Sequence, residues 1–279
     1  MEYKQIIYQP GKVARVILNR PRYLNAQSVV MREELDDAFA RAMEDEEVGA
    51  LVLSGAGDHF CSGHDISTHE DQEDRQARGF SRDRFARYKN MRAITLENTL
   101  RWRNLPKPTI AMVHGYCIFG GWIFAAAMDI IFASEDALLL PSHVQYFSVP
   151  WELGPRRTKE ILFEHRFMTA WEACEDGFVN RVYPREKLEV ETLAFAERVA
   201  ENYLSDPMRI RTTKFSVNHM EDTMGFTAAV EAAYQSFFVL AESGDQQIPH
   251  PEQGGYAQTH VARRNLELSK DWLESRLRH

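Results

Sequence analysis

Short apolar runs alternate with stretches of helical spacing in the first part of the chain. The runs at 13–19 (VARVILN) and 49–55 (GALVLSG) predict two buried strands. Between them, apolar side chains recur every three or four residues, which predicts an amphipathic helix over 28–46 with Ser28 as its N-cap. The side chains that carry this spacing are Met31, Leu35, Ala38, Phe39 and Ala42.

A second strand–helix–strand pattern follows further along the chain. The runs at 108–115 (PTIAMVHG) and 129–134 (DIIFAS) predict buried strands, and 120–128 (GGWIFAAAM) predicts a short helix between them. Strands that alternate with helices favour a parallel sheet with helices packed against it. The predicted fold class is therefore α/β.

After Pro155 the periodicity becomes helical. Three stretches of helical spacing follow one another with brief turns, at 186–204, 206–220 and 225–240. Beyond them the pattern predicts a loop and a last helix, at 243–255 and 259–276.

The change of pattern predicts two parts, a β/α core over residues 1–200 and a helical C-terminal module over residues 201–279. Within the core, the segment His69–Arg92 is rich in charge, with acidic residues giving way to basic ones. This segment is either a solvated loop and helix face or a mobile lid beside a ligand loop.

Composition narrows the class of protein. The chain has 279 residues, is 44% hydrophobic and carries a net charge of −8, with both signs interspersed. That balance argues against binding to nucleic acid, and no apolar run is long enough to predict a transmembrane helix. The three cysteines, Cys61, Cys117 and Cys174, lack the spacing of a metal site and suggest reduced thiols in the cytoplasm.

The glycine pair Gly120–Gly121 lies where a predicted strand ends and a helix begins. The first N–H groups of a helix have no intrahelical partner, so a glycine there lets a ligand oxygen approach the backbone. The alternative is that glycine only permits tight packing of helix and sheet. A second glycine, Gly63, directly precedes His64 after another buried strand, and two such donors are what an oxyanion hole needs.

Four motifs in the same order resemble the enoyl-CoA hydratase/isomerase (crotonase) superfamily. They are LNRPRYLNAQS, FCSGHDIS, PKPTIAMVHGYCIFGGWIFAAAMDIIFASEDA and ACEDGFVNRVYPREKLEVETLAFAERVAE. The resemblance implies the crotonase (ClpP-like) fold, in which repeated ββα units form a β-sheet spiral core and a helical C-terminal module makes homotrimers or homohexamers. It also implies an acyl-CoA substrate, with no cofactor and no metal.

By the same resemblance, the oxyanion donors are the backbone N–H groups of His64 and Gly120. The residues that fall where the family holds CoA are Arg22, Leu24, Ala26, Ser62 and Ile66. Hydratases of the family carry two glutamates, and this chain has Ile123 and His143 in their places. An isoleucine cannot move a proton, so the ordinary two-carboxylate hydration is disfavoured.

Two other side chains are candidates for the missing acid and base. His143 has a suitable ordinary pKa, and Glu152 lies in VPWELG, a segment that some family members use for catalysis. Trp151, Ile123 and Trp122 are candidates for the lining of the acyl pocket, although packing is the favoured role of Trp122.

The reaction therefore stays open among decarboxylation, isomerisation and C–C hydrolysis. The loop SGHDI and the later VPWELG resemble the methylmalonyl-CoA decarboxylase branch, and His143 resembles members that cleave diketones. The alternative is a CoA-thioester-binding or assembly protein that has kept the fold without catalysis.

Overall fold

The computed structural model describes residues 3–65, 68–78, 83–143 and 145–242. The predicted loop at 243–255 and the predicted last helix at 259–276 lie outside these ranges, as does Ile66.

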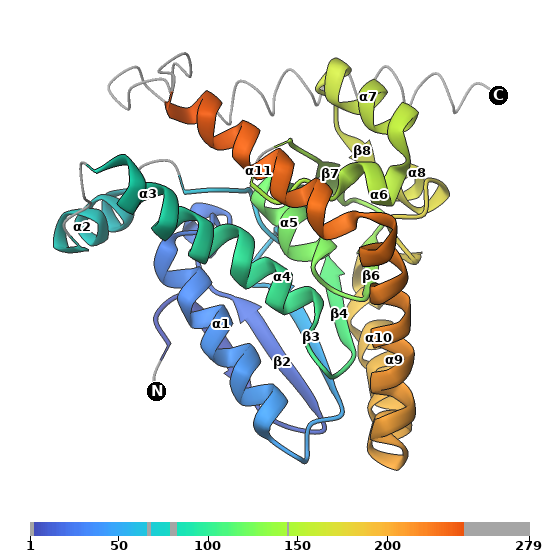
Figure 1. Ribbon diagram of the computed structural model, residues 1–279. Coiled ribbons are helices and arrows are strands. Elements are labelled where there is room, and N and C mark those ends of the chain that lie inside the picture. Colours follow the sequence, from blue (N-terminus) through green and yellow to red (C-terminus); the bar gives the residue numbers. More distant parts are fainter. Residues whose placement is uncertain (1–2, 66–67, 79–82, 144, 243–279) are drawn as a thin grey trace.

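A six-stranded sheet forms the centre of the molecule (Figure 1). Its order is β1-β2-β3-β4-β6-β9, and every pair is parallel except the edge pair β1–β2. The strands are β1 (Ile6–Gln9), β2 (Val13–Leu18), β3 (Ala50–Gly55), β4 (Thr109–Val113), β6 (Ile130–Ser134) and β9 (Arg181–Tyr183). The four strands predicted from apolar runs are β2, β3, β4 and β6, so this part of the prediction is confirmed.

A smaller sheet has the order β5-β7-β8, made of β5 (Tyr116–Ile118), β7 (Leu138–Leu140) and β8 (Met168–Thr169). Consecutive strands divide between the two sheets, because β4 and β6 join the large one while β5 and β7 join the small one. A helix follows each such pair, which gives repeated ββα units. The prediction of purely helical structure after Pro155 was wrong at β8 and β9, which are too short to show a period.

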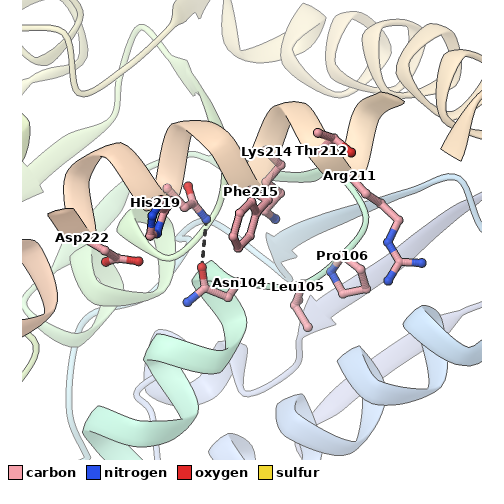
Figure 2. A pocket seen from close by; sticks show the side chains of 10 residues that line it. Asn104, Leu105, Pro106, Arg211, Thr212, Lys214, Phe215, His219 and Asp222 are labelled. Carbon is pink, nitrogen blue, oxygen red and sulfur yellow. Dashed lines mark hydrogen bonds between the residues drawn. The ribbon is translucent and has the colours of Figure 1, made fainter. Parts of the chain in front are cut away.

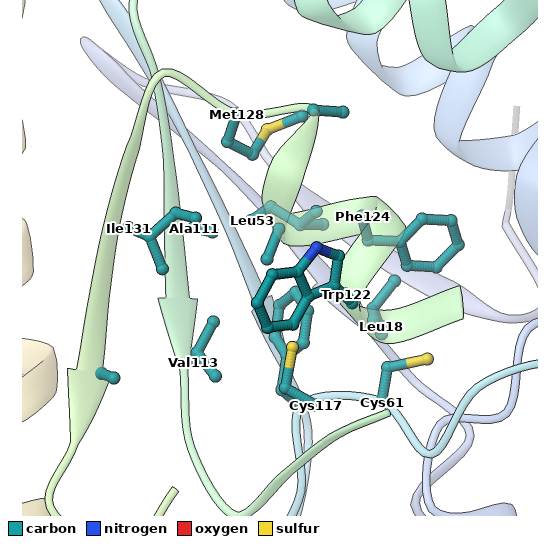
Figure 3. Packing of buried hydrophobic residues seen from close by; sticks show 14 of the residues in the cluster. Leu18, Leu53, Cys61, Ala111, Val113, Cys117, Trp122, Phe124, Met128 and Ile131 are labelled. Atoms are coloured by element: carbon teal, nitrogen blue, oxygen red, sulfur yellow. The ribbon is translucent and has the colours of Figure 1, made fainter. Parts of the chain in front are cut away.

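Helices cover both faces of the large sheet. On β3, Leu51 and Leu53 face α1 (Val29–Glu44) and α5 (Gly120–Ala126), whereas Ala50 and Val52 face α9 (Arg185–Ser205). The first face belongs to the larger apolar cluster, in which Trp122 lies among strand side chains (Figure 3). A strand buried on both faces reads as a continuous apolar run, which explains why these strands were predictable.

The predicted N-cap is confirmed, since Ser28 Oγ accepts a hydrogen bond of 3.1 Å from Met31 N. Helix α9 runs through residue 200, the predicted boundary of the core, and ends at Ser205. The remaining helices are η1 (Pro21–Tyr23), α2 (His69–Arg78), α3 (Arg84–Met91), the π-helical η2 (Arg92–Glu97), α4 (Asn98–Arg103), α6 (Val149–Leu153), α7 (Pro155–Glu164), α8 (Ala170–Glu175), α10 (Pro207–Met224) and α11 (Phe226–Glu242).

The charged segment His69–Arg92 contains α2, α3 and the first residue of η2. Most of the described side chains of α2 and α3 are exposed or half-buried, as the solvated-face alternative expects. None of the helices in the described ranges is long and apolar enough to cross a membrane.

Candidate active site

The loop that follows β3 runs beside β5 and reaches the start of α5. Ile118 N donates to Cys61 O over 3.0 Å. The backbones of Cys61 and Cys117 pair as an isolated parallel β-bridge, and both thiols are free. A Cβ built on Gly63 would lie 3.6 Å from Gly120 N, so the loop and the first turn of α5 are in direct contact. Gly63 has a φ of +100°, a conformation that favours glycine.

The hydrogen bonds around His64 set the direction of its backbone. Gln27 N donates to Gly63 O and Asp65 N donates to Gln27 O, both over 2.8 Å. In this parallel pattern the N–H of His64 points away from Gln27. The pairing with Gln27 therefore uses the carbonyl of Gly63 and the N–H of Asp65, and not the N–H of His64.

The two glycines at the start of α5 both meet close neighbours. A Cβ on Gly121 would lie 2.6 Å from Cys61 O, so this position needs glycine for packing. A Cβ on Gly120 would lie 1.4 Å from the side-chain Nε2 of Gln27. At Gly121 the neighbour is backbone, whereas at Gly120 a larger residue would have to displace the Gln27 side chain.

A buried ion pair joins the two loops that the resemblance assigned to CoA. Arg20 Nη1 binds Asp65 Oδ2 over 2.8 Å and also donates to Ala26 O over 2.6 Å. Asp65 Oδ1 accepts from Thr68 N over 2.9 Å. The carboxylate thus holds the loop after His64 against the first motif.

The predicted CoA-binding residues that the structure describes lie on these two adjoining loops. Arg22 and Leu24 are exposed, whereas Ala26 and Ser62 are buried. Ser62 N donates to Leu24 O over 2.9 Å, which joins the two loops directly. The fifth predicted residue, Ile66, is outside the described residues.

Ile123 and Trp151, two of the predicted acyl-pocket residues, meet in one apolar cluster. Ile123 packs with Tyr146 and Phe226, and the Trp151 ring lies edge-on to Phe226 at 5.6 Å. The cluster includes side chains of α11, the helix that crosses α5 in the view of Figure 1. Position 123 is therefore surrounded by apolar and aromatic side chains.

Trp122, the third predicted pocket residue, points into the main core. Its ring stacks on Phe178, with centroids 3.7 Å apart, and only 1% of the residue is exposed. Its polar end is directed to a candidate catalytic group, since Nε1 donates to Glu152 Oε2 over 2.9 Å. Trp122 thus orients Glu152 and packs the core.

Glu152 is the ionisable group with the most useful properties for acid–base chemistry. Burial raises the pKa of its carboxyl to about 7, although the nearby Ser148 hydroxyl and Trp122 N–H act in the opposite direction. A carboxyl with this pKa populates both protonation states near neutral pH and can donate or accept a proton.

The raised pKa of Glu152 predicts a pH dependence of stability. Between 4.5, the ordinary value, and about 7, the folded protein holds a proton that the unfolded chain has lost. The free energy of unfolding therefore falls as the pH rises through this window. Urea unfolding at pH 5 and pH 8 is expected to show a smaller fall for Glu152→Gln, whereas equal falls in both proteins would refute the raised pKa.

The imidazole of His64 is held by a residue that the sequence did not point to. Its Nε2 lies 2.6 Å from Gln145 Oε1, which makes this nitrogen the donor. Burial lowers the pKa of His64 to about 4, so the ring is neutral at pH 7. His64 is thus suited to offer its backbone N–H, while its side chain fixes the loop of Gln145.

His143, the other candidate acid or base, lies in the same loop as Gln145 and is exposed. In the described part of the chain no hydrogen bond joins His143 to Glu152. The described residues also contain no group of three His, Cys, Asp or Glu side chains that could hold a metal ion.

Two surface pockets lie away from the glycine pair. The first, of about 450 Å³, lies between α10 and the turn that joins α4 to β4 (Figure 2). The second, of about 490 Å³, is lined by Asp58, His59, Gly115, Tyr116, Asp136 and Arg185. Gly120 lines neither of these two pockets, and the space where its Cβ would lie is filled by the side chain of Gln27.

Comparison with known proteins agrees with this architecture. Residues 9–247 match the family model described as enoyl-CoA hydratase/isomerase. A Mycobacterium tuberculosis protein that carries the name of an enoyl-CoA hydratase, EchA13, is 35% identical over 256 residues, which are 84% of this chain and 80% of that protein.

Solved structures show the same fold. The crystal structure of a probable enoyl-CoA hydratase from Mycobacterium thermoresistibile has a TM-score of 0.77 and 38% identity, covering 86% of this chain and 97% of that one. An enoyl-CoA hydratase/isomerase from Xanthobacter autotrophicus Py2 has a TM-score of 0.76 and 30% identity, covering 99% of both chains. The chain therefore has the crotonase fold and belongs to the enoyl-CoA hydratase/isomerase family.

Proposed function

We propose that this protein is an enzyme that processes an acyl-CoA thioester through an enolate. The observation that supports this proposal is the contact between the loop after β3 and the start of α5. The Cβ position of Gly63 lies 3.6 Å from Gly120 N. This contact supports an oxyanion hole made by the N–H groups of His64 and Gly120. Donors of this kind stabilise the negative charge that develops on the thioester oxygen.

Glu152 is the proposed acid and base. As a carboxylate it removes a proton from the α-carbon, and the electron pair of the broken C–H bond moves onto the thioester oxygen. As an acid it returns that proton to carbon, which completes an isomerisation. In a decarboxylation the departing CO₂ leaves the same enolate, and the acid form of Glu152 protonates the α-carbon.

Ile123 suits these reactions better than hydration. It lies in an apolar cluster and provides neither a donor nor an acceptor for an attacking water. His143 is the second candidate for acid–base chemistry, favoured by its loop, which also carries the partner of His64. Turnover that survives in His143→Ala but not in Glu152→Gln would assign the proton transfer to Glu152 alone.

The experiment that tests the function is calorimetric titration with a panel of CoA thioesters, paired with a turnover assay on each. The panel holds an enoyl, a malonyl-type and a diketone-type ester. Binding with turnover of at least one member is expected. Binding of all without turnover would favour the alternative, a CoA-thioester-binding or assembly protein, and absence of binding would refute both.

We propose further that the chain assembles as a homotrimer or homohexamer in the cytoplasm. Helix α10 carries three exposed apolar side chains at i, i+3 and i+7, namely Val217, Met220 and Met224. An exposed apolar row of this kind is typical of a surface that is buried on assembly.

Replacement of Met220 by glutamate is therefore expected to dissociate the oligomer. Met220 is 55% exposed in the single chain, so the charge should not disturb the fold of the protomer. Light scattering is expected to give the mass of one chain for Met220→Glu and of the oligomer for the matched control Met220→Leu. An unchanged mass in Met220→Glu would exclude this face from the interface.

A further inference from the structure

A cation is buried behind the proposed thioester site without an ion-pair partner among the described residues. Arg32, on α1, is 3% exposed, and the hydrogen bonds of its guanidinium go to neutral acceptors. Asp36, one turn further along α1, binds Arg101 and the indole of Trp102 instead. Burial lowers the pKa of Arg32 to about 9, so the group remains charged at neutral pH.

The π-helical segment η2 contributes two of these acceptors. Arg32 donates to the carbonyls of Ile94 and Thr95, and in a π-helix the carbonyls lie out of the ordinary α-helical register. The side chains of Asn98 and Thr99, at the start of α4, accept over 2.8 Å and 2.6 Å. The guanidinium also lies over the rings of Trp102 and Phe124, with Cζ 4.8 Å and 5.3 Å from their centroids. It is therefore fixed in position by neutral acceptors and aromatic faces, with no salt bridge among the described residues.

The remaining acceptor of Arg32 is Gln27, whose side-chain amide lies between the guanidinium and the glycine pair. Arg32 Nη1 donates to Gln27 Oε1 over 2.7 Å, and this bond fixes which end of the amide is nitrogen. Gln27 is 4% exposed, and its Nε2 has no hydrogen-bond partner within the described ranges. A buried amide N–H₂ without an acceptor is unfavourable, so a ligand acceptor would stabilise it.

The free nitrogen of Gln27 is aimed at Gly120. The position of a Cβ on Gly120 lies 1.4 Å from Nε2, 2.5 Å from Cδ and 3.2 Å from Cγ, so the amide approaches nitrogen-first. The amide N–H₂ of Gln27 thus occupies the space that a side chain at position 120 would fill. Hydrogen bonds in series polarise one another, so the Arg32 charge makes this donor stronger.

We propose that Gln27 is a third hydrogen-bond donor to the thioester oxygen of the acyl-CoA, with Arg32 as the positioning residue behind it. This inference rests on the proposed function. The site would then take a thioester whose oxygen becomes strongly negative, and the buried Arg32 charge would favour the enolate through the Gln27 amide. Gln27 is catalytic in this assignment because it touches the reacting group.

The test is infrared difference spectroscopy of a non-reacting acyl-CoA labelled with ¹³C at its thioester carbonyl. Donors to the oxygen lower the stretching frequency, so the bound band in the wild-type protein is expected below that of the free ligand. Gln27→Leu, which removes the donor, should move the band toward the free value and lower kcat about 100-fold.

A second variant keeps the test decisive if Gln27→Leu does not fold. Gln27→Glu forms an ion pair with Arg32 and supplies no donor, so it should fold and should also raise the frequency. Gln9→Leu, the same change on the exposed edge strand, should leave the band unaltered. A wild-type shift that persists in Gln27→Glu would overturn the assignment of Gln27 while the proposed function stands, and absence of any bound band would overturn both.

Discussion

Replacement of Glu152 by glutamine is expected to lower kcat about 100-fold to 10,000-fold, with KM little changed. The amide keeps the size of the side chain, and its oxygen can still accept the hydrogen bond of Trp122 Nε1. The variant loses only the ability to take up and release a proton. Steady-state kinetics on the substrate found in the thioester panel would measure the effect.

The matched control is Glu135→Gln, an exposed glutamate in the turn between β6 and β7. It is expected to leave kcat unaltered. If Glu152→Gln retained wild-type turnover, the carboxylate would be a structural partner of Trp122, and the proton transfer would have to be assigned to another group such as His143.

Replacement of Gly120 by alanine is expected to lower kcat/KM about 100-fold to 1,000-fold, comparable to the loss of one oxyanion donor. The new methyl group would occupy the position of Gln27 Nε2, so either the amide or the start of α5 must move. Movement of either displaces the donors from the thioester oxygen.

The two positions should be strongly coupled. Gln27→Ala removes the three atoms that lie nearest to the new methyl group, so adding Gly120→Ala to Gln27→Ala should cost little further activity. A double-mutant cycle measures this coupling. Losses that simply multiply would show that the two residues do not share the same space.

The fold was largely predictable because its central strands are buried on both faces. Strands β3 and β4 are continuous apolar runs, and α1 shows helical spacing and a serine cap that is used as expected. The short strands β5, β7, β8 and β9 were missed, since segments of two or three residues show no period. The antiparallel edge strand β1 was missed as well.

The site was predictable only in part. The glycine pair and Gly63 signal close approach of the backbone, and the structure brings them together. The raised pKa of Glu152 and its bond to Trp122 depend on burial, which no local pattern reveals. Gln27 directly precedes Ser28, the N-cap of α1. Its polar side chain was the one local signal of the buried pair that it forms with Arg32.

Stabilisation of a thioester enolate can be measured by solvent deuterium exchange, without knowledge of the full reaction. Each CoA ester that binds is incubated with the protein in D₂O, and deuterium at the α-carbon is followed by proton NMR. Exchange is expected at the α-carbon of at least one ester, and it should be greatly slowed in Glu152→Gln. No exchange and no turnover with any bound ester would contradict this expectation.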